Sequence, residues 1–215
     1  MPRLDAVTEP VETRAQRKER TRQALLDRAL ELLASRTFAS VSLREVARAA
    51  GIVPTAFYRH FASMDELGVV LAEDSMRVLR RMLRDARRTP SSRNARDSLD
   101  ILVRQVRAHE AEFRFVARER YGGVPEVRRA IATELRLFVS ELTIDLGRMP
   151  ALGDWDAPDL EMAADLIVQA MLAAVVDLLE VDRPGSADER AVIDRTAKQL
   201  RLITIGMGGW KPARP

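Results

Sequence analysis

The sequence contains no cysteine among its 215 residues, which excludes a disulfide framework and a thiolate metal site. Aromatic residues are also scarce at 5%, and there are only ten glycines and ten prolines. What remains is 47% hydrophobic and 31% charged, a balance typical of a helical globular protein rather than a disordered chain. No run of 18 or more apolar residues is present, so we expect no membrane span.

Features of secretion and of enzymes are missing as well. Residues 1–13 are polar, are interrupted by Pro2 and Pro10, and have no apolar stretch such as a signal peptide needs. We therefore expect a disordered N-terminal tail and a cytoplasmic protein. The chain contains no Gly-x-Ser-x-Gly elbow, phosphate-binding Gly-Lys-Ser/Thr loop or dinucleotide fingerprint. Only His60 and His109 are present as histidines, so we expect no metal, no cofactor and no enzymatic activity.

Positive charge is concentrated near the N-terminus. Residues 14–62 contain ten Lys or Arg and four Asp or Glu, a net +6, whereas the whole chain carries only +3. A positive region on a near-neutral body is expected of a domain that binds phosphates. A solvated basic face explains the charge alone about equally well, so the charge needs support from local motifs.

Apolar residues recur with helical spacing after residue 13, and no convincing period-two strand is present. The pattern predicts an all-α protein of about nine helices, at residues 14–35, 42–51, 54–60, 63–88, 95–107, 110–121, 124–148, 158–181 and 187–206. Two capping boxes, Ser42 with Glu45 and Ser63 with Glu66, mark helix starts. Gly51 provides the left-handed conformation that ends a helix abruptly.

The spacing of Ala47, Gly51 and Phe57 predicts a helix-turn-helix motif. Two helices that cross closely need a small residue at the contact, a glycine-type turn four positions later and an apolar residue six further on. Such a triplet is common by chance. Its place between two capping boxes and after a basic helix is what favours the motif.

Roles within the motif follow from which part of the DNA each side chain could reach. Thr55 and Ala56 are expected to face base edges, and Tyr58 and His60 to hold phosphates. Packing against the long helix is the alternative for Tyr58 and the favoured role of Phe61. The full set of expected DNA-binding residues is Arg17, Lys18, Ser42, Arg44, Thr55, Ala56, Tyr58, Arg59 and His60.

Three runs in this region resemble the TetR family of transcriptional repressors: residues 42–52 (SLREVARAAGI), 55–61 (TAFYRHF) and 65–67 (DEL). The resemblance implies a TetR-type fold, with a three-helix helix-turn-helix DNA-binding domain at residues 14–62. It also implies a helical ligand-binding and dimerisation domain at residues 63–215. Met64 departs from the pattern, because many members place a phosphate-binding lysine there.

Residues 14–22, 39–43 and 113–122 further resemble the regulators of unsaturated fatty-acid synthesis of the FabR and DesT type. This resemblance implies a homodimer on a palindromic operator, controlled by a long-chain acyl-CoA whose unsaturated and saturated forms act oppositely. The alternatives are a repressor of an efflux or catabolic gene that responds to another hydrophobic small molecule, an enzyme of acyl-CoA metabolism, and a non-specific nucleic-acid packing protein.

The middle helices supply apolar side chains that would line a tunnel for the acyl chain, although each is more simply explained as core. These expected ligand-binding residues are Met82, Leu99, Val103, Phe113, Phe115, Leu135, Phe138 and Met171. On the family resemblance, Arg118 and Arg120 would hold the phosphates of CoA. The alternative role for these two arginines is on a surface face of the helix, paired with Glu112 or Glu119.

The helix over residues 158–181 is apolar almost all round, so it needs burial on two sides. We therefore expect a homodimer through the last two helices, which would require a palindromic operator. Small or apolar residues expected at this interface are Ala163, Ala170, Ala174, Ile193, Ala197, Leu200 and Ile203. The long helix from Ser63 is expected to carry the effect of the ligand to the DNA-binding domain.

Overall fold

The computed structural model describes residues 13–88 and 95–211. Within them the chain forms helices and no strand, which confirms the predicted all-α fold. The nine α-helices are α1 (Arg14–Leu33), α2 (Leu43–Ala49), α3 (Pro54–Phe57), α4 (Met64–Arg88), α5 (Ala95–Ala108), α6 (Glu110–Glu119), α7 (Pro125–Gly147), α8 (Ala157–Leu179) and α9 (Ala187–Gly209). Two short 3₁₀ helices, η1 (Phe38–Ser40) and η2 (Pro150–Leu152), lie in connections. The predicted tail, residues 1–13, lies almost entirely outside the described residues.

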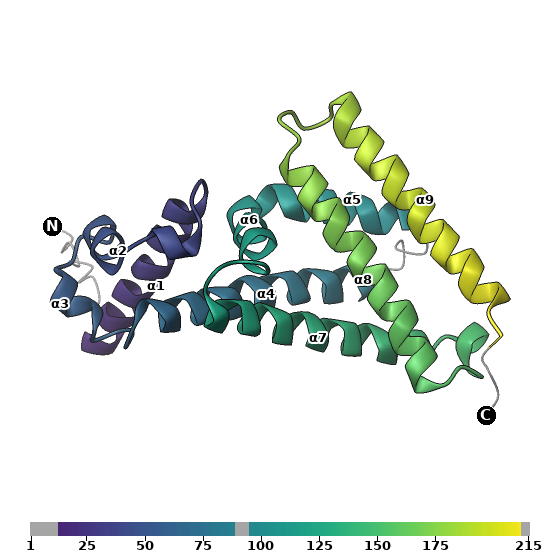
Figure 1. Ribbon diagram of the computed structural model, residues 1–215, viewed down its shortest axis with the longest axis horizontal. Helices are drawn as coiled ribbons and strands as arrows, with labels where there is room; N and C mark the ends of the chain where they lie inside the picture. Colours follow the sequence, from purple (N-terminus) through teal and green to yellow (C-terminus); the bar gives the residue numbers. More distant parts are fainter. Residues whose placement is uncertain (1–12, 89–94, 212–215) are drawn as a thin grey trace, which may run out of the picture.

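The helices are arranged as a small head and a larger body (Figure 1). Helices α1, α2 and α3 form the head at one end of the molecule. Helix α4 leaves the head and runs through the body beside α7, with α6 close to the head. Helices α8 and α9 form an antiparallel pair at the far end. Helices α4 and α6 are the two body helices with the most extensive contacts to α1 of the head among the described residues.

Two of the three helices of the head, α1 and α2, begin at side-chain caps. The Ser42 capping box is present as predicted, and Thr13 with Gln16 forms another at the start of α1 that the sequence analysis did not predict. The second predicted box is only half correct. The Ser63 hydroxyl accepts from the Glu66 amide, but the Glu66 carboxylate accepts from the amide of Ala62 instead of Ser63.

The predicted helix-turn-helix is present. Helix α2 ends in a Schellman motif, in which the amide of Ile52 donates to the Ala47 carbonyl and that of Gly51 to the Arg48 carbonyl. Gly51 has φ +71°, the left-handed conformation that glycine adopts without strain. Ala47 and Phe57 are both fully buried, at 0% exposure. The turn thereby holds α3 at a fixed angle on α2.

The recognition segment differs from the prediction in its length. We expected a helix from Pro54 to His60, but regular α-helix ends at Phe57. The next residues continue as tighter turns, with the amides of Arg59 and His60 donating to carbonyls three positions earlier. A guanidinium nitrogen of Arg22 on α1 binds the His60 carbonyl at 2.8 Å, which ends the segment against α1.

Head and body share one continuous core, joined at Phe38. This ring is 2% exposed and packs edge-on against Phe115 of α6, with centroids 6.4 Å apart. Gly68 of α4 makes room for it, because a Cβ atom there would lie 2.5 Å from the Phe38 ring and 2.6 Å from Val127. The connection between α1 and α2 is therefore seated in the body.

Helix α8 is the one described helix that is long and apolar enough to cross a membrane by length and composition alone. A core helix of a globular protein passes the same test. Eight buried residues place α8 against the rest of the chain: Leu160, Ala163, Ala164, Val168, Ala174, Val175, Leu178 and Leu179.

Candidate nucleic-acid interface

The structure brings the nine predicted DNA-binding residues together in the head, and none of them is fully buried. Arg17 and Lys18 are exposed on the first turns of α1, and Ser42 and Arg44 begin α2. The remaining residues lie on or directly after α3: Thr55, Ala56, Tyr58, Arg59 and His60. Their exposure makes these side chains available to a ligand.

Unpaired cations border the recognition segment. Arg44, Arg48 and Arg59 are exposed and have no ion-pair partner within the described part of the chain. Arg44 and Arg48 also line an open hollow between α2 and α3, together with Gly51, Ile52, Val53 and Pro54. Sequence analysis missed Arg48 as a candidate, although its position four residues after Arg44 places both on one face of α2.

Ser42 caps α2 as predicted, and this role engages the donors that a phosphate contact would need. Its main-chain N–H and its hydroxyl both donate to Oε2 of Glu45, at 2.9 and 2.8 Å. Both donors that a phosphate would use are therefore engaged inside the protein. The structure gives Ser42 the role of a helix cap, and a phosphate contact there stays a prediction that would have to displace Glu45.

The Glu45 carboxylate is held in its charged form. The guanidinium of Arg36 binds Oε1 at 2.7 Å. This bond, followed by the bonds from the Ser42 amide and hydroxyl, lowers the pKa of Glu45 to about 2. Arg36 also donates to the carbonyl of Ser40. The segment before α2 is thus tied to the first turn of the helix.

Replacing Glu45 by glutamine is expected to reduce the loss of stability in acid. Because the folded-state pKa lies below the ordinary value of 4.5, the contribution of Glu45 is present above pH 4.5 and is lost as pH falls toward 2. Urea midpoints measured from pH 2 to 7 should therefore converge for the wild type and Glu45→Gln at low pH. Arg36→Gln should remove much of the same pH dependence, and parallel curves for wild type and Glu45→Gln would contradict the assignment.

Tyr58 and Phe61 belong to the same segment, but Tyr58 is exposed and Phe61 is buried. Tyr58 is 62% exposed, and its hydroxyl has no hydrogen-bond partner among the described residues. Phe61 is 1% exposed, packs on Phe57 and lies under the guanidinium of Arg22, 4.2 Å from its ring centroid. The predicted burial of Phe61 is confirmed, although the contacts described are with Phe57 and with Arg22 of α1 rather than with the long helix. The alternative of a packed Tyr58 is wrong.

His60 carries little of the positive charge in this region. Partial burial, and then the nearby cations Lys18, Arg22 and Arg59, lower the pKa of His60 below its ordinary value. A neutral imidazole has one N–H to donate. A phosphate contact by His60 stays a prediction.

Six of the eight predicted apolar ligand-binding residues lie in or against the core of the body. Leu99, Phe113 and Phe115 are buried in the main apolar cluster, and Val103, Leu135 and Met171 are half-buried against it. Phe138 is half-buried on α7, and the side chain of Met82 lies outside the described residues. Of the two hollows described, one is in the head and the other is on α9, and neither is lined by these residues. Their role as a ligand wall stays a prediction.

The two predicted phosphate-binding arginines of the body already have partners. Arg118 donates to the main-chain carbonyls of Leu33 and Arg36, and so it lies between body and head. Arg120 lies 4.7 Å from the ring centroid of Tyr121 and within 3.5 Å of the Gln169 side chain. The surface pairing with Glu112 or Glu119 that we considered as their alternative is absent from the contacts that the described residues make.

Three of the seven residues expected at the dimer interface face the chain's own core instead. Ala163, Ala174 and Leu200 are buried in the chain's own core. Four others are half-buried against it: Ala170, Ile193, Ala197 and Ile203. The assignment is therefore wrong for the three buried residues, because helical period alone does not tell which stripe of an all-apolar helix meets its own core. For the four half-buried residues it stays a prediction.

Comparison with known proteins agrees with this arrangement of a helix-turn-helix head on a helical body, which is the architecture of a transcriptional regulator. Residues 25–68 match the model of bacterial regulatory proteins of the tetR family. Residues 92–207 match the tetracyclin repressor-like C-terminal domain. The chain therefore belongs to the TetR family of transcriptional regulators.

Solved structures share the fold at low sequence identity. The fatty acid degradation regulator FadR from Bacillus halodurans is 16% identical, with a TM-score of 0.66 over 89% of this chain and 96% of that one. AibR, solved with isovaleryl coenzyme A and operator DNA, is 19% identical, with a TM-score of 0.63 over 84% and 97%. FadR from Bacillus subtilis, solved with stearoyl-CoA, is 15% identical, with a TM-score of 0.61 over 86% and 98%.

Proposed function

We propose that the protein binds a palindromic operator as a homodimer and is controlled by a long-chain acyl-CoA, in the manner of regulators of unsaturated fatty-acid synthesis. The observation that carries the DNA-binding part is the exposed recognition segment, which is bordered by two unpaired arginines on α2, Arg44 and Arg48, and by Arg59 directly after α3. Thr55 is exposed at its start, and its hydroxyl makes no hydrogen bond among the described residues. A free hydroxyl and methyl group are what a base edge in the major groove requires.

Support for an acyl-CoA effector comes from the body and from the fold. The main apolar cluster extends through the body, where it includes two phenylalanines of α6, Phe113 and Phe115. Two proteins of the same fold were solved with isovaleryl coenzyme A and with stearoyl-CoA. The sequence resemblance to the FabR and DesT type points to the same class of ligand.

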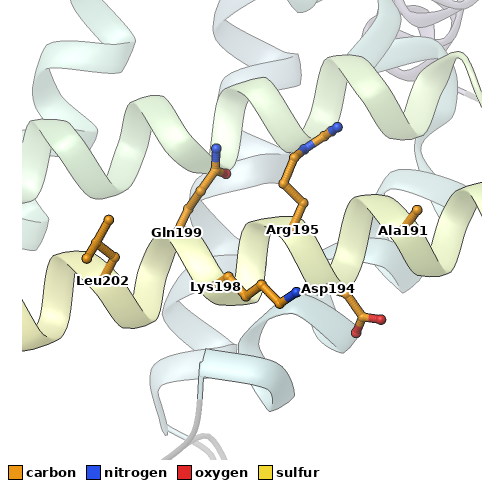
Figure 2. Close-up of a pocket in the computed structure, with 6 residues that line it drawn as sticks. All are labelled: Ala191, Asp194, Arg195, Lys198, Gln199 and Leu202. Carbon is orange, nitrogen blue, oxygen red and sulfur yellow. The ribbon is translucent and has the colours of Figure 1, made fainter.

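An outward stripe on α8 and α9 supports the homodimer. Large apolar side chains that are 42% to 71% exposed line this face: Met162, Leu166, Val176, Leu202 and Ile205. Figure 2 shows the hollow beside them on α9, where Arg195 and Gln199 point toward α8. Arg195 forms an ion pair with Asp177 of α8. Exposed apolar stripes of this kind are typical of subunit interfaces.

The decisive experiment is a gel shift on the protein's own promoter and on desaturase promoters, with oleoyl-CoA and palmitoyl-CoA added separately. We expect the protein to shift DNA that contains a palindrome, and we expect the two acyl-CoA ligands to change its DNA affinity in opposite directions. A response to a cationic drug and to neither acyl-CoA would favour an efflux regulator. Equal affinity for every duplex would leave only non-specific binding and overturn the proposal.

Variants of the recognition segment separate base reading from phosphate binding. Thr55→Ala should relax the preference at one base position by about 1–3 kcal/mol. Tyr58→Phe should weaken binding to all duplexes about equally, because a phosphate contact carries no sequence information. Fluorescence anisotropy over a set of single-substitution operators measures both effects. Unchanged base preference in Thr55→Ala would remove the role assigned to Thr55.

A further inference from the structure

The C-terminal end of α6 holds the main chain that connects α1 to η1. We call residues 33–38 of this connection the junction segment. Nη1 of Arg118 donates to the carbonyl of Leu33 at 3.1 Å and to that of Arg36 at 2.7 Å. The next residue, Glu119, accepts the amide of Phe38 through Oε1 at 2.8 Å. Two adjacent side chains of the body thus bind three main-chain groups of the head.

These bonds satisfy groups that would otherwise lack partners. The last carbonyls of a helix have no intrahelical donor, and α1 ends at Leu33. Glu119 is only 2% exposed, so its carboxylate depends on protein donors rather than on water. Gly122 leaves space for that carboxylate, because a Cβ atom there would lie 2.1 Å from Oε2 of Glu119. The end of α6 is therefore shaped around the junction segment.

The contacts continue from the junction segment to the DNA-facing side of the head. The side chain of Arg36 binds Glu45, and Glu45 binds both donors of Ser42 at the start of α2. On the body side, Phe38 is seated against Phe115 of α6. An unbroken series of hydrogen bonds and packing contacts thus joins α6 to the helix that precedes the recognition segment.

We propose that Arg118 and Glu119 are positioning residues that fix the orientation of the head on the body, and thereby the separation of the two heads in a dimer. The proposal rests on the proposed homodimer. A dimer reads half-sites at one spacing only if each head is held rigidly. Helix α4 joins the head to the body by a single chain connection. Because the head could rotate about one connection, other contacts must fix its orientation. Helix α6 supplies these contacts and is a second route, beside α4, from the body to the head.

The test compares two arginines of α6. Arg118→Ala removes both bonds to the junction segment. Arg114→Ala is the matched control, because Arg114 also binds a main-chain carbonyl, that of Leu179 at 3.0 Å, but within the body. Affinities are measured for operators whose half-site spacing is changed by one or two base pairs, and for a duplex without the palindrome.

Arg118→Ala should lose about tenfold in affinity at the best spacing and should bind neighbouring spacings almost as well. Its binding to the duplex without the palindrome should not change, because every DNA-facing side chain is intact. Arg114→Ala should keep the wild-type spacing preference. Glu119→Gln should also keep it, since the amide oxygen still accepts from Phe38, whereas Glu119→Leu should lose it. The proposal would be overturned if Arg118→Ala kept the wild-type preference for one half-site spacing. It would also be overturned if Arg114→Ala lost that preference to the same extent as Arg118→Ala.

A second measurement does not depend on DNA binding. The chain has no cysteine, so spin labels at Ala49→Cys in the head and Ser140→Cys in the body report one defined distance when labelled protein is diluted with unlabelled protein. The distance distribution should broaden in Arg118→Ala and stay narrow in Arg114→Ala. If the wild type binds no palindrome while this contrast holds, the proposed function fails and the positioning role stands. Equal distributions would remove the positioning role.

Discussion

Replacing Phe57 by alanine is expected to destabilise the protein by about 3–5 kcal/mol and to abolish recognition of a palindrome. The ring is 0% exposed and packs on Phe61, with centroids 5.7 Å apart. Its removal leaves a cavity between α1, α2 and α3, and the turn that orients the recognition segment loses its apolar support. Chemical unfolding followed by circular dichroism measures the first effect, and anisotropy on a palindrome measures the second.

Tyr58→Ala is the matched control, because it removes an aromatic ring from the next residue. That ring is 62% exposed and packs only edge-on against Phe57, with the ring centroids 5.9 Å apart. Its loss should cost no more than about 1.5 kcal/mol of stability, while weakening binding to all duplexes. Equal destabilisation by the two variants would show that burial of Phe57 does not hold the head together.

Phe115→Ala is expected to have the second large effect on stability. The size of this effect distinguishes a core residue from one that lines a ligand tunnel. The ring is 1% exposed and lies at the contact between α6 and Phe38, so we expect a loss of about 3–5 kcal/mol in the free energy of unfolding. The loss should be present without any added ligand, as measured by urea unfolding. A side chain that lines an empty tunnel would cost far less, because few neighbouring atoms would lose contact with it.

Phe138→Ala provides the comparison within the predicted ligand-binding set. Phe138 is only half-buried on α7. We expect a smaller loss of stability than for Phe115→Ala, together with a changed thermal shift on addition of oleoyl-CoA if this region receives the acyl chain. A loss of less than about 1 kcal/mol for Phe115→Ala would mean that the ring is part of a cavity and not of the core.

The local parts of the DNA-binding site were predictable because their determinants are close together in sequence. Ser42 and Glu45 cap one helix, and Gly51 and Phe57 complete the turn within the following twelve residues. Dihedral preference, capping and apolar spacing act over this range without help from the rest of the chain. Arg48 was missed because a basic residue on a helix face carries no signal of its own until its neighbours are known.

The body was less predictable, because its residue roles depend on contacts between distant segments. Arg118 binds carbonyls 85 and 82 residues earlier in the chain, and no periodicity within α6 indicates those partners. Ala163 and Ala174 were assigned to a subunit interface, but they face the chain's own core. An apolar helix has no polar stripe to mark its outer side, so packing alone decides its orientation.

The sequence by itself determined the order of the helices, the Ser42 cap and the helix-turn-helix, since these follow from interactions between residues a few positions apart. Only the tertiary structure decided which faces of α8 and α9 are left outside, and that α6 binds the junction segment. Those outcomes follow from competition for burial and for hydrogen-bond partners across the whole chain. The physical reason is that a short segment specifies its own backbone, whereas the partner of a side chain is specified only once the segments have packed.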